Sequence, residues 1–259
     1  MVARLRPYGL QIHMLIYTPL LLAADSRLHD AVPQLGLGVL TFVTLGLLTS
    51  RVSPDIRRQA WLCVLLSTGF EIFGSLVWGV YRYRFHNVPL YVPPGHGMVY
   101  LFGLTLARAP LFTLHTARVK RVILAVATIW AAAGLTVLVP FTGRVDVAGA
   151  LCLPLFYWFV TRSPRGAVFA AIFIATSELE LFGTALRDWT WLPVAPWSHI
   201  GVGNPPSAIA GAYSVIDGSV LAVLAAVAAL RRNQPALGRR RGRPAGGRVL
   251  TDVEAELQR

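Results

Sequence analysis

Two glutamates stand in nearly the same short sequence, at positions 71 and 180. The first passage reads Phe-Glu-Ile-Phe-Gly-Ser at 70–75, and the second reads Leu-Glu-Leu-Phe-Gly-Thr at 179–184. Each passage lies in an apolar stretch and is followed by aromatic residues and then by a double proline. A carboxylate inside a membrane-spanning segment is costly and usually functional. The duplication therefore predicts one site built from two related halves.

The polar residues near the two glutamates differ between the copies, and distinct acid and base roles need such a difference. The candidate catalytic residues are Glu71, His96, Glu180 and Asp217. The candidate substrate-binding residues follow the glutamates in the chain; they are Trp78, Tyr81, Arg82, Tyr83, Arg84, Trp189, Trp191 and Asn204. The alternative interpretation of the aromatic residues is a belt at the membrane surface.

This set of residues fits acid–base chemistry on a carbon–carbon double bond. A buried carboxylic acid can protonate an alkene, and a second carboxylate with aromatic faces can stabilise the cation that forms. A metal held by the carboxylates and His96 is a weaker alternative, because no second histidine stands at helical spacing. The sequence has no nucleophile elbow, phosphate loop or zinc-protease motif, so we expect no cofactor.

The composition indicates a polytopic membrane protein. The 259 residues are 55% hydrophobic and 14% charged, with a mean hydropathy of +0.57. Since a span needs about 20 apolar residues, the chain predicts an all-α transmembrane bundle of about eight helices. The predicted helices are 9–24, 33–49, 59–80, 94–107, 119–141, 146–161, 166–186 and 207–230.

The distribution of basic residues predicts the orientation. With the N-terminus inside, the inner segments hold 19 of the 24 lysines and arginines. We therefore expect a multi-pass protein of the inner (plasma) membrane with both termini in the cytoplasm. The glutamates lie four predicted helices apart, so both helices run outward. This predicts two parallel four-helix repeats, 9–107 and 119–230, within a membrane domain of residues 1–232.

Both glutamates are then expected in the outer half of the bilayer, in a cavity that opens to the outer face. Because proline is favoured in a first helical turn, Pro93-Pro94 and Pro205-Pro206 should begin the fourth and eighth helices, with Asn204 or Ser207 as a possible cap of the eighth. The positive ends of those helices either stabilise the glutamates or hold a polar head group or developing negative charge.

The segment 233–259 is rich in arginine, glycine and proline and predicts a disordered basic cytoplasmic tail. We expect it to contact anionic lipid head groups. Nucleic acid is not an expected partner, because no aromatic residue is interleaved with the arginines. The two cysteines, Cys63 and Cys152, fall in apolar stretches and are expected to be small core residues.

The order of residues around the glutamates resembles the membrane-embedded carotenoid hydratases of the bacterioruberin type. The residues that carry this resemblance are Glu71, Gly74, Tyr81, Tyr83, Val88-Pro89, Gly183-Thr184, Trp189, Trp191 and Gly203-Asn204-Pro205. The chain departs from that family at the Pro-Pro-Gly-His segment of 93–96 and at Pro205-Pro206. The resemblance implies acid–base chemistry on an alkene of a lipid-soluble isoprenoid.

The sequence thus favours an integral membrane enzyme that acts on a membrane lipid or isoprenoid as a hydratase, cyclase or isomerase. One alternative is a small transporter coupled to protons or cations, and another is a membrane scaffold subunit. The enzyme is favoured because the polar residues gather toward the outer side, whereas a transport path should stay polar toward the cytoplasm.

Overall fold

A computed structural model describes residues 8–233, and most of this part of the chain is α-helical. The expected all-α fold class is confirmed. The described residues form nine α-helices: α2 (Gly9–Asp25), α3 (Ala31–Thr49), α4 (Pro54–Glu71), α5 (Val92–Leu106), α6 (Pro110–Leu135), α7 (Val139–Thr142), α8 (Val147–Arg162), α9 (Gly166–Ala185) and α10 (Ala210–Asn233). A π-helix, η2 (Ile72–Trp78), continues α4, and two short strands are β1 (Tyr81–Tyr83) and β2 (Trp189–Trp191). Residues of the predicted tail beyond Asn233 lie outside the described range.

Several of these helices are long and apolar enough to cross a membrane. Within the described residues, four meet both conditions: α3, α4 with η2, α9, and α10 to Arg232. A fifth span arises if α5 and α6, which are bent by 96° at their junction, count as one. The helix α8 is apolar but shorter. Four to five such helices are compatible with a multi-pass membrane protein.

The starts of the helices follow ordinary capping rules. Asp30 accepts a hydrogen bond from the backbone N–H of Val32 at the start of α3, and Ser53 caps α4 just before its first-turn proline. The helix α5 begins at Val92 with Pro93 and Pro94 in its first turn, as expected.

The double proline of the second copy does not begin a helix, so this prediction is wrong. The helix α10 starts at Ala210, three residues after the expected start at 207. The carboxylate of Asp146 accepts hydrogen bonds from the backbone N–H groups of Gly203 (2.9 Å) and Ser207 (2.7 Å). These bonds hold 203–207 as a turn, and neither Asn204 nor Ser207 caps α10.

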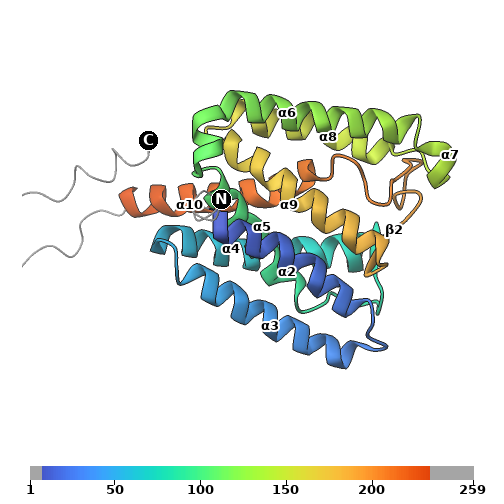
Figure 1. Ribbon diagram of the computed structural model, residues 1–259, viewed down its shortest axis with the longest axis horizontal. Coiled ribbons are helices and arrows are strands. Elements are labelled where there is room, and N and C mark those ends of the chain that lie inside the picture. Colours follow the sequence, from blue (N-terminus) through green and yellow to red (C-terminus); the bar gives the residue numbers. More distant parts are fainter. Residues whose placement is uncertain (1–7, 234–259) are drawn as a thin grey trace, which may run out of the picture. The chain divides into compact units, whose positions relative to one another are not determined.

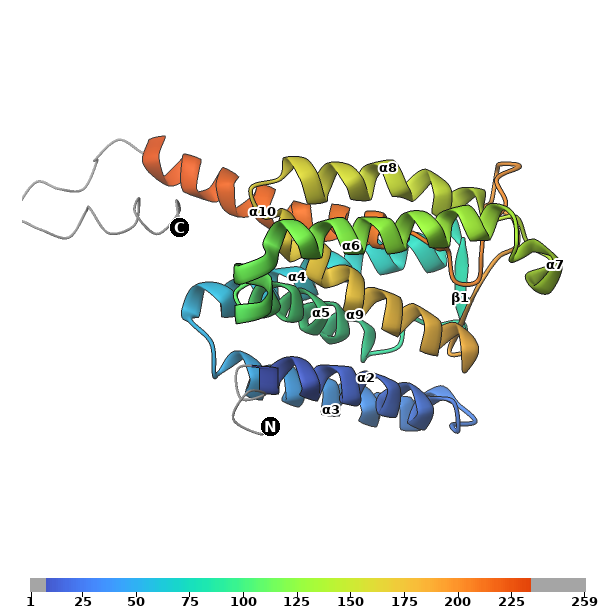
Figure 2. The ribbon, with the colours of Figure 1, turned by 45° about the horizontal axis from the view of Figure 1, so that its top comes forward.

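The helix α5 lies at the centre of the residues up to Ala222, which form one compact unit. It packs against α4 and α9 (Figures 1 and 2), and nearly all of its residues are buried. Two glycines permit this close packing, because a Cβ on Gly97 would lie 2.7 Å from Val64 of α4, and one on Gly103 would lie 2.3 Å from Ile172 of α9. His96, one turn into α5, is thereby fixed in the interior.

The strands β1 and β2 pair with each other in antiparallel register, and the sequence analysis did not predict them. Tyr81 pairs with Trp191, Arg82 with Thr190 and Tyr83 with Trp189. The ribbon lies at one end of the helices, as the labels of β2 in Figure 1 and β1 in Figure 2 show. It joins the segment that follows Glu71 to the segment that follows Glu180.

Candidate functional site

The carboxylate of Glu71 accepts hydrogen bonds from three side chains. Its Oε2 atom accepts from the phenols of Tyr81 and Tyr83, both at 2.7 Å, and its Oε1 atom lies 2.7 Å from Nε2 of His96. Glu71, Tyr83 and His96 are buried. Burial and the neighbouring Glu71 raise the pKa of both Tyr81 and Tyr83. Both phenols therefore remain protonated and act as donors to the carboxylate.

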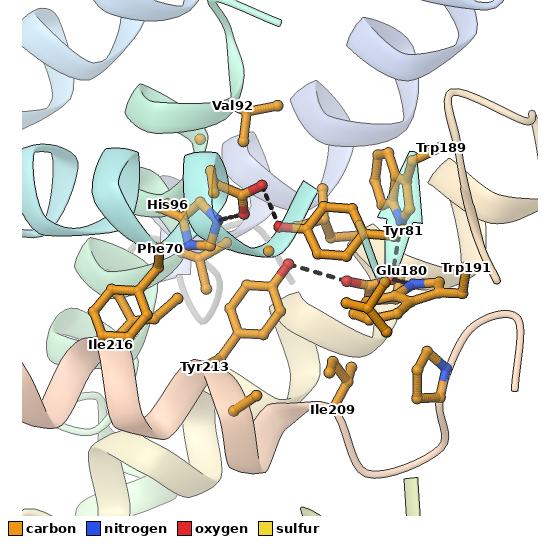
Figure 3. A pocket seen from close by; sticks show the side chains of 18 of the residues that line it. Phe70, Tyr81, Val92, His96, Glu180, Trp189, Trp191, Ile209, Tyr213 and Ile216 are labelled. Atoms are coloured by element: carbon orange, nitrogen blue, oxygen red, sulfur yellow. Dashed lines mark hydrogen bonds and ion pairs between the residues drawn. The ribbon is translucent and has the colours of Figure 1, made fainter. Parts of the chain in front are cut away.

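The carboxylate of Glu180 has a matching arrangement with different donors. Its Oε2 atom accepts from the indole N–H groups of Trp189 and Trp191, both at 3.0 Å, and its Oε1 atom accepts from Tyr213 at 3.1 Å. Figure 3 shows the Tyr213 hydroxyl directed at Glu180, with both indoles converging from the strand. Glu180 is 2% exposed, so this carboxylate is also buried.

The surroundings of the two carboxylates are equivalent, because each receives two donors from one strand of the β ribbon and a third donor from a following helix. In each, the two outer residues of a three-residue strand point to the same face, as alternation along a strand requires. The third donor comes from the first turns of a following helix, His96 of α5 or Tyr213 of α10. These two rings stack with centroids 5.0 Å apart. The Tyr81 and Trp191 rings, 4.6 Å apart, connect the arrangements on the ribbon side.

A glycine three residues after each glutamate makes room for the strand side chains. A Cβ on Gly74 would lie 2.8 Å from the Tyr81 hydroxyl, and one on Gly183 would lie 1.9 Å from the Trp189 ring. The sequence did not predict that these two glycines make room for the strand side chains within each half of the site. A hydroxyl at the next position, Ser75 or Thr184, bonds to the carbonyl oxygen of the glutamate in both copies.

The two copies differ by one residue between glutamate and strand. Tyr81 is ten residues after Glu71, whereas Trp189 is nine after Glu180. The helix η2 contains the extra residue as wider π-helical turns, a feature frequent at functional sites. It ends at Trp78 and is followed by Gly79, whose φ of 72° lies in the left-handed region that glycine adopts readily.

Both glutamates line a single cavity of about 580 Å³. Its polar wall contains Glu71, Glu180, His96 and the hydroxyl groups of the tyrosines, and most of the remaining wall is aliphatic or aromatic. Residues from α2, α4, α5, α8, α9 and α10 contribute to it; Figure 3 shows Phe70, Val92, Ile209 and Ile216 around the polar groups. Such a pocket suits an apolar ligand that presents one reactive position to the carboxylates.

The structure brings together most, but not all, of the residues that the sequence singled out. The side chains of Trp78, Tyr81, Tyr83, His96, Trp189 and Trp191 line the cavity with the two glutamates. Asp217 lies one turn beyond Tyr213, beside Cys63, with 3.7 Å between Oδ1 and the sulfur. Its Oδ2 atom is buried and has no hydrogen-bond partner among the described residues. Cys152 is half-buried in α8 and lines the cavity.

The predicted binding residues Arg82, Arg84 and Asn204 have other surroundings. Arg82 is exposed on β1. Arg84 lies 2.6 Å from Asp188 and 3.3 Å from Asp25, two carboxylates that are almost fully buried. The side chain of Asn204 accepts a hydrogen bond from the backbone of Trp191. The contacts of Arg84 and Asn204 therefore hold together the segments at the ribbon end of the helices.

Tyr213, Asp25 and Asp146 are site-supporting residues that the sequence analysis missed. Tyr213 is the counterpart of His96, but it lies seven residues after Pro206, whereas His96 lies two residues after Pro94. A search one or two turns into α10 could have found it. Among the described residues, no group of three or more His, Cys, Asp or Glu side chains could hold a metal ion.

Comparison of the chain with protein-family models, with curated proteins and with solved structures gives no match. The resemblance to carotenoid hydratases therefore stays an expectation from the sequence, and the site has to be interpreted from its own geometry.

Proposed function

We propose that the protein is an integral membrane enzyme that protonates a carbon–carbon double bond of an isoprenoid lipid. The observation that carries the proposal is the pair of buried carboxylates, each with three hydrogen-bond donors, on the wall of one largely apolar cavity. Isoprenoid hydrocarbon suits the apolar wall. The tyrosine and tryptophan rings beside the carboxylates supply faces that attract a carbocation.

The different partners of the two carboxylates suggest different roles. Glu71 lies 2.7 Å from Nε2 of His96, a side chain that can pair a positive charge with a buried carboxylate. The donors to Glu180 are neutral indole and phenol groups, and a buried carboxyl without a cation favours its neutral form. We assign the proton donor to Glu180, with Tyr213 as its hydrogen-bond partner, and the stabilising anion to the Glu71–His96 pair. Environments that separate two carboxyls in this way are typical of acid–base pairs.

In the proposed reaction, the proton of Glu180 adds to one carbon of the double bond and leaves a cation on the other. The cation then loses a proton from a neighbouring carbon, or adds water and releases a proton, or is attacked by a second double bond to give a cyclic cation that in turn loses a proton. These outcomes are isomerisation, hydration and cyclisation. In each, the released proton returns the enzyme to its starting state through the carboxylates, so no oxidant or cofactor is needed.

The proposal includes two parallel four-helix halves, 9–107 and 119–230, with the site in the outer half of an inner-membrane bundle and both termini cytoplasmic. The equivalent surroundings of Glu71 and Glu180 support two related halves, as does the antiparallel pairing of their strands. The resemblance to carotenoid hydratases favours the same substrate class. Contact of the basic tail with anionic lipids remains a further prediction for residues outside the described range.

The test uses the purified protein in liposomes with acyclic isoprenoids of 15, 20 and 40 carbons, followed by mass spectrometry of the extracted lipids. We expect the wild type to yield an isomer or a hydrate of one of them, and Glu180→Gln and Glu71→Gln each to lower the rate at least 100-fold. Glu178→Gln is the matched control, because this half-buried glutamate lies about 200° around α9 from Glu180. Full turnover by both site variants would overturn the proposal.

A proton-coupled transporter is the second candidate, and buried polar groups on the far side of His96 favour it. Asp217 and Cys63 follow His96, and Gln59 then accepts hydrogen bonds from Tyr100 (3.2 Å) and Arg165 (2.7 Å). This series leads toward the start of α9 and could carry protons. Solute movement that follows an imposed proton gradient in liposomes, without chemical change of any lipid, would favour transport.

A further inference from the structure

The mouth of the cavity is formed by helices rather than by loops. Among the described residues, the lining side chains that are exposed are Phe70 (39%) and Phe73 (54%) of α4 and η2, and Leu151 (60%) and Leu155 (37%) of α8. Phe70 and Phe73 are three residues apart and Leu151 and Leu155 four, so each pair shares one helix face. The sequence predicted an opening to the outer face, whereas these four exposed side chains lie on the helices and are all apolar.

The ribbon end of the same cavity is covered. Lining residues from the segment after β2, including Ala195, Ile200 and Val202, are buried or half-buried. Beside them, Arg84 binds the buried carboxylates of Asp25 and Asp188 and the carbonyl oxygen of Ser26. This polar layer joins α2, the segment after β1 and the turn before β2 at that end of the helices.

We infer that the cavity takes its substrate sideways from the hydrocarbon of the membrane, between α4–η2 and α8, and that its ligand is a single isoprenoid chain. An exposed apolar rim costs free energy in water and almost none against lipid tails. The α4–η2 segment is itself long and apolar enough to span the membrane, so Phe70 and Phe73 would face hydrocarbon. This inference rests on the proposed function for the identity of the ligand.

The volume limits how much of the chain can enter. At roughly 30 Å³ for each non-hydrogen atom, the share of a water molecule in the liquid, 580 Å³ holds about 20 atoms. That corresponds to about four isoprene units. A longer isoprenoid would place its reacting end beside the glutamates and leave the remainder in the bilayer through the open mouth.

Photolabelling in liposomes tests this route without requiring turnover. The probe is a 16-carbon fatty acid that carries a diazirine near its methyl end, and a small charged diazirine serves as the aqueous comparison. After irradiation, peptides that contain cavity-wall residues such as Ile209, Tyr213 and Ile216 are examined for adducts. We expect the fatty acid to label them and the charged probe to label them at least fivefold less.

Variants of the rim should change this labelling in opposite directions. Leu151→Trp and Leu155→Trp narrow the mouth and should reduce cavity adducts at least threefold, while Phe73→Ala widens it and should increase them. Val43→Trp is the control, because Val43 is 53% exposed on α3 and outside the rim. Thermal unfolding of each variant checks its fold. If one of the two tryptophan variants does not fold, the other serves as the narrowed-mouth variant.

Equal labelling by both probes, or cavity adducts that do not respond to any rim variant, would overturn lateral entry. The experiment is repeated with Glu180→Gln, whose labelling should match that of the wild type. Cavity labelling in a protein that converts no isoprenoid would leave the entry route standing and refute the proposed function. Conversion of isoprenoids without rim-dependent labelling would support the proposed function and refute the entry route.

Discussion

The hydrogen bonds to Glu180 predict a large difference in stability between two substitutions at one position. In Glu180→Gln, the amide oxygen can accept from both indole N–H groups and the amide nitrogen can donate to Tyr213, so all three bonds are retained. In Glu180→Leu, which has similar bulk, all three are lost and two donor-only indoles remain buried. We therefore expect the glutamine variant to unfold near the wild type and the leucine variant to unfold much earlier.

The size of the loss follows from the number of bonds. Hydrogen bonds between membrane helices contribute about 0.6 kcal/mol on average and about 1.7 kcal/mol at most. Three lost bonds correspond to roughly 2–5 kcal/mol, and at about 2–4 °C for each kcal/mol a central value near 3.5 kcal/mol lowers the melting temperature by roughly 7–14 °C. Thermal unfolding of the detergent-purified proteins, followed by tryptophan circular dichroism, measures it. Equal melting temperatures for the leucine and glutamine variants would refute the hydrogen-bonding scheme.

Two further predictions concern the supports of the site. Gly183→Ala places a methyl group against the Trp189 ring and should lower stability by about 1–3 kcal/mol, whereas Gly69→Ala, with nothing within 4 Å, should be neutral or stabilising in the same thermal assay. Burial raises the pKa of Asp188 to about 7; nearby Asp25 adds to the shift and Arg84 opposes it. The folded protein then holds this proton more tightly than the unfolded chain, whose aspartate pKa is about 3.9, so stability should fall as pH rises from about 4 to about 7. Asp188→Asn should flatten melting temperature against pH in that window; an unchanged slope would contradict the assignment.

The repeated glutamate motif was visible in the sequence because its parts are local. A glutamate, a glycine three residues later and aromatic residues about ten residues later fix half of each carboxylate environment by helix and strand geometry. The alternating Tyr-Arg-Tyr and Trp-Thr-Trp segments also contained a signal for the β ribbon, since their outer residues must share a face.

The remaining features depend on packing between distant segments. Tyr213 was hidden because Asp146, far away in the chain, delays the start of α10 and shifts the counterpart of His96. The carboxylates of Asp25 and Asp188 share Arg84 only after α2 and the ribbon meet. The mouth between α4–η2 and α8 likewise follows from which helix faces remain uncovered, which periodicity alone does not specify.

The most direct test of the central claim is the origin of a hydrogen atom in the product. Wild-type protein in liposomes prepared with D₂O is given less than one equivalent of a 20-carbon acyclic isoprenoid, so that each site reacts once, and the product is analysed by mass spectrometry and NMR. Protonation of a double bond predicts one deuterium bound to carbon in each product molecule, and Glu180→Gln should abolish its formation. A product without carbon-bound deuterium, or undiminished deuterium incorporation by Glu180→Gln, would contradict the assignment of Glu180 as the proton donor.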